Sequence, residues 1–154
     1  MKLQKLIDTD QVFLDLDASS KEEVISVLAE QLAPQVRLTT EEVSAALLER
    51  ERLGSTSVGD GFAIPHCKLA GISTIRIALG RFSHGIDFGA SDNRPVTFFF
   101  VVLSPPDQPA AHLQVLSQIA RVLKRSELRD LLLAAKDEES VVQAIRQIAE
   151  VEGL

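Results

Sequence analysis

A glycine-rich segment followed by a histidine is the feature of this sequence that points most directly to chemistry. Residues 54–61 read Gly-Ser-Thr-Ser-Val-Gly-Asp-Gly, and His66 follows them directly behind Pro65. Glycines carry no Cβ, so their main-chain N–H groups can approach an anion closely. Proline fixes its own φ and restricts the residue before it, which stiffens the backbone that carries His66. This arrangement suits a nucleophile that must meet a phosphoryl group in line.

Histidine also fits reversible phosphoryl transfer, because a neutral imidazole nitrogen is nucleophilic near neutral pH. A second histidine, His112, lies in the first turn of an expected helix, where the positive end of the helix dipole disfavours the imidazolium form. As a neutral donor, His112 could hydrogen-bond a phosphate oxygen. Arg50, Arg52 and Lys68 flank the loop in the sequence and supply cations for a phosphoryl group.

The same residues allow other interpretations. Taken alone, His66 would usually be a surface residue of a loop, and His112 would more often be a helix-start residue hydrogen-bonded to its neighbours. Arg50 would be favoured at a helix C-terminus in any case. Cys67 beside His66 could suggest a cysteine hydrolase, but adjacent residues of an extended chain point to opposite faces. A zinc site from His66, Cys67 and His112 would lack a fourth ligand and the usual paired spacing. His84 is interpreted as an ordinary turn residue.

Regular elements before and after the glycine-rich segment must position these side chains. Residues 20–23 and 39–42 both read as capping boxes, and apolar residues at helical spacing follow each of them. These patterns predict one helix that ends at Pro34 and a second that ends before Gly54. The segment 54–61 itself is too rich in small residues to be predicted as regular structure.

Strands are predicted in the middle of the chain. Residues 12–16, 74–82 and 95–103 have the apolar patterns of strands, and the last is apolar nearly throughout, as in a central strand covered on both faces. A turn-rich stretch, residues 83–94, joins the last two strands.

Helices are predicted again after the last strand. Residues 110–124 have the pattern of an amphipathic helix. Ser126 can cap a further helix that runs to Ala135, and Asp137 can cap the final one. The apolar stripe predicted for the first of these helices consists of Leu113, Leu116, Ala120 and Leu123. We therefore expect one domain, residues 1–154, that combines helices and strands.

Composition excludes several classes of protein. With a net charge of −6, a pI near 5.1 and no cluster of basic residues, the chain is not expected to bind nucleic acid. No apolar run reaches the length of a membrane span, so no membrane insertion is expected. The single cysteine and the absence of an apolar leader indicate a cytoplasmic protein. Phosphoryl transfer to a histidine requires neither a metal nor an organic cofactor.

Several motifs together resemble the active-site signature of the IIA domains of the mannitol and fructose class of the bacterial phosphotransferase system. Residues 50–56, Gly59 and residues 61–66 carry the resemblance, which continues in residues 92–96 and 112–113 and spans essentially the whole chain. Separated motifs in the right order are far more specific than one glycine-rich loop. The resemblance implies the α+β (mixed α/β) class, a single domain with a mixed central sheet of about five strands flanked by helices.

The resemblance also implies roles for individual residues. His66 would be the phosphorylated residue, through Nε2, His112 its neutral hydrogen-bond donor and Arg50 a cation that stabilises the phosphate. We expect N–H groups of the glycine-rich loop to hold further phosphate oxygens. The candidate residues of this phosphate-binding loop are Ser55, Thr56, Gly59, Asp60 and Gly61.

The implied partners are other proteins. Phosphoryl groups would arrive from a small histidine phosphocarrier protein (HPr- or NPr-like). The pattern is most similar to the nitrogen-regulatory branch of the family, which implies phosphorylation-dependent binding to regulated targets such as transporters or sensor kinases. An alternative function is delivery of the phosphoryl group to a sugar permease of the fructose or mannitol type.

Overall fold

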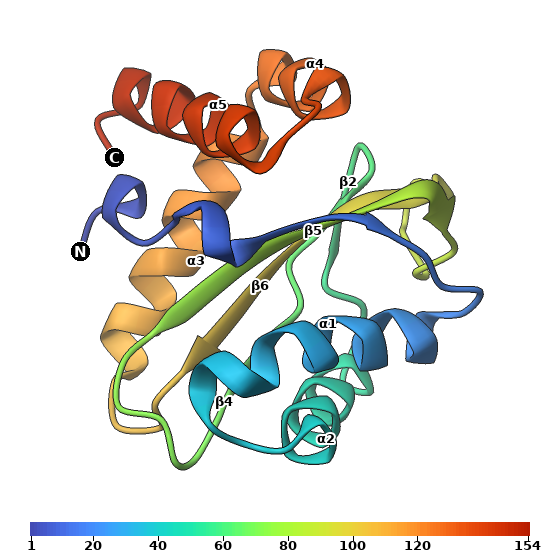
Figure 1. Ribbon diagram of the computed structural model, residues 1–154, viewed down its shortest axis with the longest axis vertical. Coiled ribbons are helices and arrows are strands. Elements are labelled where there is room, and N and C mark those ends of the chain that lie inside the picture. The colour runs from blue at the N-terminus through green and yellow to red at the C-terminus, as the bar shows by residue number, and fades with distance from the viewer.

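A mixed six-stranded sheet runs through the centre of the protein, with helices packed on both of its faces (Figure 1). The computed structural model describes all residues, 1–154. Two short 3₁₀ turns precede the sheet. The elements, in chain order, are 3₁₀ turns Leu3–Lys5 and Thr9–Gln11, β1 Val12–Leu16, α1 Lys21–Val36, α2 Thr40–Glu51, β2 Ser57–Gly59, β3 Phe62–Ala63, β4 His66–Lys68, β5 Arg76–Ile86, β6 Val96–Ser104, α3 Pro109–Leu123, α4 Ser126–Ala134 and α5 Glu138–Val151.

The strands follow the order β1-β5-β6-β3-β2, and β4 also pairs with β6. The β1–β5, β3–β6 and β4–β6 pairs are parallel, whereas β5–β6 and β2–β3 are antiparallel. The predicted α+β class with a mixed sheet is therefore confirmed. The sheet has six strands rather than about five, because the segment before Lys68 contributes three very short strands that have no long apolar pattern.

Two apolar layers cover the faces of the sheet, and β6 contributes to both. Alternate residues of a strand point to opposite faces. One set from β6 packs under α3, α4 and α5, and the other packs against α1 and α2. Every residue of β6 except Thr97 is buried, which confirms the prediction of a central strand covered on both faces. The two sets are Phe98, Phe100 and Val102, and Phe99, Val101 and Leu103.

The first two helices begin where the capping residues predict. Ser20 accepts a hydrogen bond from the N–H of Glu23, and Thr39 forms a complete capping box with Glu42. The predicted end of α1 at Pro34 is wrong, because the helix continues to Val36. Arg37 caps the C-terminus of the helix: its N–H donates to the carbonyl oxygen of Ala33, and its left-handed φ of 58° turns the chain out of the helix.

The stretches predicted to be irregular contain strands. Residues 57–59 and 62–63 form a hairpin whose turn uses the positive φ angles of Gly59, Asp60 and Gly61. The segment 83–94 begins with the end of β5, so His84 is an exposed strand residue and its prediction as a turn residue is wrong. Gly85 permits this continuation, because its φ of 67° accommodates an irregularity in the pairing with β6.

The buried face of α3 includes only part of the predicted stripe. Leu123 is buried and Leu116 packs against the core, whereas Leu113 is 67% exposed. Val115, Ile119 and Val122, which the predicted stripe left out, are buried, and so is the polar residue His112. Ser126 is also not a cap: α4 starts at Ser126, and the residue before it makes no side-chain cap. The predicted cap of α5, Asp137, is confirmed, since it accepts a hydrogen bond from the N–H of Ser140.

Candidate functional site

His66 lies on a strand at the edge of the sheet, rather than in the loop where the sequence placed it. Strands β3 and β4 both pair with β6 in the same register, so they are two halves of one strand interrupted at Ile64 and Pro65. β2 covers the outer side of β3, whereas β4 has no outer partner and forms the edge. Proline has no N–H to donate, which breaks the ladder at this point. The carbonyl of Pro65 still accepts from Val102, and this bond fixes the backbone next to His66.

The ring of His66 is oriented by its own backbone. Its Nδ1 donates to the carbonyl oxygen of Ile64 over 2.6 Å, so in the neutral ring Nε2 carries the free lone pair. Burial lowers the pKa of His66, and the nearby Arg50 lowers it further, against opposing effects of the Ile64 carbonyl and Glu51. His66 is therefore a neutral imidazole at pH 7 with Nε2 available as a nucleophile.

The fold brings His112 beside His66. Their ring centroids are 5.6 Å apart, with the planes inclined at 47°. His112 is 7% exposed, and its Nδ1 lies 2.5 Å from the hydroxyl oxygen of Ser104 at the end of β6. Burial lowers the pKa of His112, and the charges of His66 and Lys68 act in the same direction. The cavity thus holds two neutral rings side by side.

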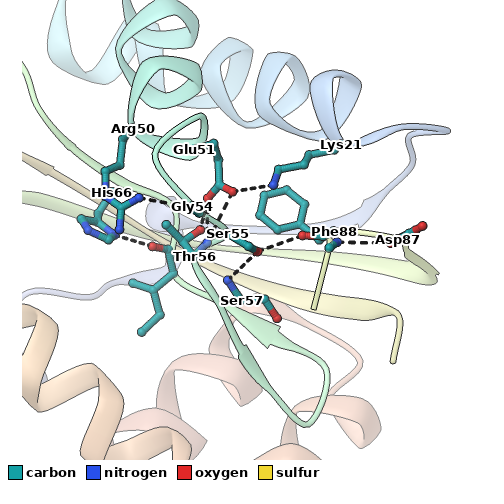
Figure 2. Close-up of polar contacts among 12 residues, drawn as sticks. Lys21, Arg50, Glu51, Gly54, Ser55, Thr56, Ser57, His66, Asp87 and Phe88 are labelled. Atoms are coloured by element: carbon teal, nitrogen blue, oxygen red, sulfur yellow. Dashed lines mark hydrogen bonds and ion pairs between the residues drawn. The ribbon is translucent and has the colours of Figure 1, made fainter. Parts of the chain in front are cut away.

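Both histidines line an open cavity of about 490 Å³ between α2, β4 and the start of α3. Arg50 reaches it from the last turn of α2, and its Nη1 donates to the carbonyl of Gly54 over 3.0 Å (Figure 2). Lys68 lines the cavity from β4, whereas Arg52 is exposed and is not among the lining residues. The remaining lining residues are Ala46, Glu49, Leu53 and Cys67.

A buried carboxylate next to Arg50 holds the glycine-rich segment in place. Glu51 is 6% exposed and accepts hydrogen bonds from the N–H of Thr56, over 3.1 Å, and from the Thr56 hydroxyl. Its other oxygen lies 2.7 Å from Nζ of Lys21, which sits 4.6 Å above the ring of Phe88 (Figure 2). Sequence reasoning missed Glu51 and Ser104, because a charged residue at a helix end and a serine at a strand end give no signal of burial.

The expected phosphate-binding loop is not assembled around His66. Gly59, Asp60 and Gly61 form the tip of the β2–β3 hairpin, and the extended chain from Gly61 to His66 spans about 16 Å. None of the five candidate loop residues lines the cavity. Phosphate binding by this loop stays a prediction, and in the structure the glycines of the hairpin tip serve the turn.

The other loop candidates have structural partners as well. The N–H and the hydroxyl of Thr56 both donate to the carboxylate of Glu51. The Ser55 hydroxyl donates to the carbonyl of Phe88 over 2.9 Å. Asp60 adopts a φ of 56°, receives an ion pair from Arg94 at 3.2 Å, and has its N–H bonded to Asp92. These contacts pin the hairpin tip to the 90–95 segment.

The structure gives little support to the alternatives of a cysteine nucleophile and a metal site. Cys67 packs into the layer beneath α1 and α2, and burial raises the pKa of its thiol to about 12. Such a thiol is not ionised near neutral pH. No group of three or more His, Cys, Asp or Glu side chains is placed to hold a metal ion. None of the helices has the length and apolar character needed to span a bilayer.

Known proteins resemble this chain along nearly its full length. Residues 5–148 match the family model described as phosphoenolpyruvate-dependent sugar phosphotransferase system, EIIA 2. A nitrogen regulatory protein of Pseudomonas aeruginosa is 32% identical over 146 residues, which are 94% of this chain and 95% of that protein. The fructose-specific EIIABC component of Bacillus subtilis is 32% identical over 148 residues, 96% of this chain but only 23% of that protein.

A solved structure gives the same result for the fold. The crystal structure of nitrogen regulatory protein IIA-Ntr from Neisseria meningitidis superimposes with a TM-score of 0.88 at 29% sequence identity. The match covers 93% of this chain and 98% of that one.

Proposed function

We propose that this chain, which belongs to the EIIA 2 family of the phosphoenolpyruvate-dependent sugar phosphotransferase system, carries a phosphoryl group on Nε2 of His66. One observation carries the proposal: the bond from Nδ1 of His66 to the Ile64 carbonyl leaves the Nε2 lone pair free beside a cavity whose lining includes Arg50 and Lys68. The ring is held in one orientation before any partner arrives, so little freedom is lost in the reaction.

In the transfer, the Nε2 lone pair of His66 attacks the phosphorus of a donor's phosphohistidine. The new N–P bond forms as the donor's N–P bond breaks, and that electron pair returns to the donor ring. The proton on Nδ1 stays with His66, held by the Ile64 carbonyl. Because a bond of the same kind is made and broken, the protein's main contribution is positioning and charge stabilisation.

Arg50, Lys68 and His112 are the groups proposed to hold the phosphate oxygens. Arg50 is restrained by the Gly54 carbonyl and keeps its other guanidinium donors for an anion. Lys68 adds a second cation at the rim of the cavity. None of the candidate residues of the glycine-rich loop lines the cavity, so the proposal assigns the phosphate oxygens to these side chains.

We infer a regulatory output for the carried group, with nitrogen regulation as its setting. Relatives of comparable length named nitrogen regulatory protein, and the TM-score of 0.88 to IIA-Ntr, support this assignment. The alternative, delivery to a fructose-type permease, is supported by the match to the EIIABC component. The two outputs differ in one measurable respect: a delivering protein passes its phosphoryl group to a permease domain, whereas a switch need only receive it.

Protein partners are the proposed donors and targets. Leu53 lines the His66 cavity and is 83% exposed, and Leu113, which follows His112 in α3, is 67% exposed. Exposed apolar residues of this kind suit docking of a small histidine phosphocarrier protein. A phosphoryl group would add about −1.5 to −2 charges at this surface. That change can alter the binding of target proteins, such as transporters or sensor kinases, in the cytoplasm.

The test is intact-mass analysis after incubation with phosphoenolpyruvate and the general phosphotransferase proteins. We expect one acid-labile phosphoryl group on the wild-type protein and on His84→Ala, a control that removes an exposed histidine elsewhere. We expect none on His66→Ala. If the wild type stays unmodified while the same donors phosphorylate another IIA protein, the proposed chemistry of His66 is wrong.

A further inference from the structure

Ser104 is the last residue of β6, and its hydroxyl lies beside Nδ1 of the His112 ring. The residue has no exposed surface, and its Oγ is 2.5 Å from Nδ1 of His112. Its main-chain carbonyl accepts a hydrogen bond from the N–H of Leu69. The side chain is therefore shielded from water and makes one polar contact, to a residue of the proposed site.

The direction of this hydrogen bond follows from what a buried hydroxyl needs. A serine hydroxyl has one hydrogen to donate, and buried polar hydrogens are almost always paired. If Nδ1–H of His112 donated to Ser104, the hydroxyl hydrogen would have no acceptor, because Oγ has no other hydrogen-bond partner in the structure. If the hydroxyl donates to Nδ1, both atoms are satisfied. The second arrangement is the favourable one for a neutral ring.

We propose that Ser104 is a positioning residue, whose hydroxyl donates to Nδ1 of His112 and thereby places the ring's single proton on Nε2. His112 then presents an N–H donor to a phosphoryl group on His66. This inference rests on the proposed function for its consequence in phosphoryl transfer, although the position of the proton on His112 can be measured in the unphosphorylated protein.

The two histidines then have opposite tautomers, set by the kind of atom at each Nδ1. His66 Nδ1 faces the Ile64 carbonyl, which can only accept, so its Nε2 keeps a lone pair. His112 Nδ1 faces a hydroxyl that donates, so its Nε2 carries the hydrogen. With ring centroids 5.6 Å apart, one ring is prepared as a nucleophile and its neighbour as a donor. A lone pair on Nε2 of His112 would instead repel the phosphate oxygens.

The experiment uses histidine labelled with ¹⁵N, whose ring shifts distinguish the protonated from the unprotonated nitrogen of each neutral imidazole. We expect His112 of the wild type to be in the Nε2–H form. In Ser104→Ala that preference should be lost, and the two tautomers of His112 should coexist. Ser104→Thr keeps a hydroxyl and should keep the Nε2–H form, while Ser117→Ala, an exposed site on α3, serves as the control.

The same variants are then phosphorylated to equilibrium with the donor proteins. We expect the phosphorylation equilibrium constant of Ser104→Ala to fall about tenfold, because a hydrogen bond to a charged oxygen is weakened. An Nδ1–H form of His112 in the wild type, or an unchanged tautomer and equilibrium in Ser104→Ala, would overturn the proposal. A wild type that is never phosphorylated would refute the proposed function, and the ¹⁵N shifts would still decide the role of Ser104.

Discussion

Replacing Glu51 by glutamine tests the network that holds the segment between α2 and β2. The carboxylate is 6% exposed, accepts two hydrogen bonds from Thr56 and pairs with Lys21 at 2.7 Å. Glutamine has nearly the same shape and keeps one oxygen for Thr56. The substitution removes the negative charge and replaces one acceptor oxygen of the carboxylate by an NH₂ group, which donates. The substitution therefore isolates the charge with little change in packing.

The expected loss of stability can be bounded from the exposure of the two partners. Hydrogen bonds to charged groups contribute about 1.5–3 kcal/mol, and breaking a fully buried ion pair costs about 3–5 kcal/mol. The side chain of Lys21 is 27% exposed, so its ammonium can recover water when the partner charge is lost. We therefore expect Glu51→Gln to lower the free energy of unfolding by about 2–3 kcal/mol, which corresponds to a fall in Tm of about 5–10 °C for a chain of this size.

Urea denaturation followed by circular dichroism measures this loss, and Glu49→Gln is the matched control. Glu49 lies on the same helix, is exposed, forms no ion pair, and its replacement changes the net charge equally. We expect the control to stay within about 0.5 kcal/mol of the wild type. The reasoning is refuted if Glu51→Gln is no less stable than Glu49→Gln. A double-mutant cycle with Lys21→Met should show a coupling energy, and strict additivity would assign the loss to Thr56 alone.

Three further predictions concern the site and the sheet. Arg50→Lys keeps the charge but not the planar fork, so we expect the phosphorylated fraction at equilibrium to fall about tenfold by intact-mass analysis. Desolvation lowers the pKa values of the part-buried His66 and the buried His112 below the ordinary 6.5. As pH falls below about 6.5 the unfolded chain therefore binds protons first, and the free energy of unfolding should decrease. An NMR titration that places either pKa at or above 6.5 contradicts this. Gly85→Ala places a Cβ 2.8 Å from the Cβ of Pro95 at a φ of 67°, so we expect a loss of about 1–3 kcal/mol in urea denaturation, and an unchanged midpoint would refute that clash.

Local rules predicted the elements whose signals lie close together in the sequence. The start of α2 could be predicted because Thr39 and Glu42 form both halves of the capping box. The end of α1 could not be predicted from Pro34, because the left-handed conformation of Arg37 terminates that helix. The hairpin at residues 57–63 was missed because its strands are only two or three residues long, and because β6, which pairs with β3, lies far along the chain.

The residues of the candidate site that belong to a sequence motif could be predicted. The residues that hydrogen-bond to them could not, because the fold brings them together from separate parts of the chain. His66, His112 and Arg50 were selected by residue type and resemblance, and the structure brings all three to one cavity. The hydrogen bonds that orient them come from Ile64, Ser104 and Gly54. These partners are ordinary residue types whose position depends on sheet register and helix ends, which the sequence does not reveal by itself.

The cavity lies where the two apolar layers meet at the edge of the sheet. Arg50 comes from α2, which packs on one face, and His112 comes from α3, which packs on the other. An anion held by both residues would therefore link two helices that cover opposite faces of the sheet.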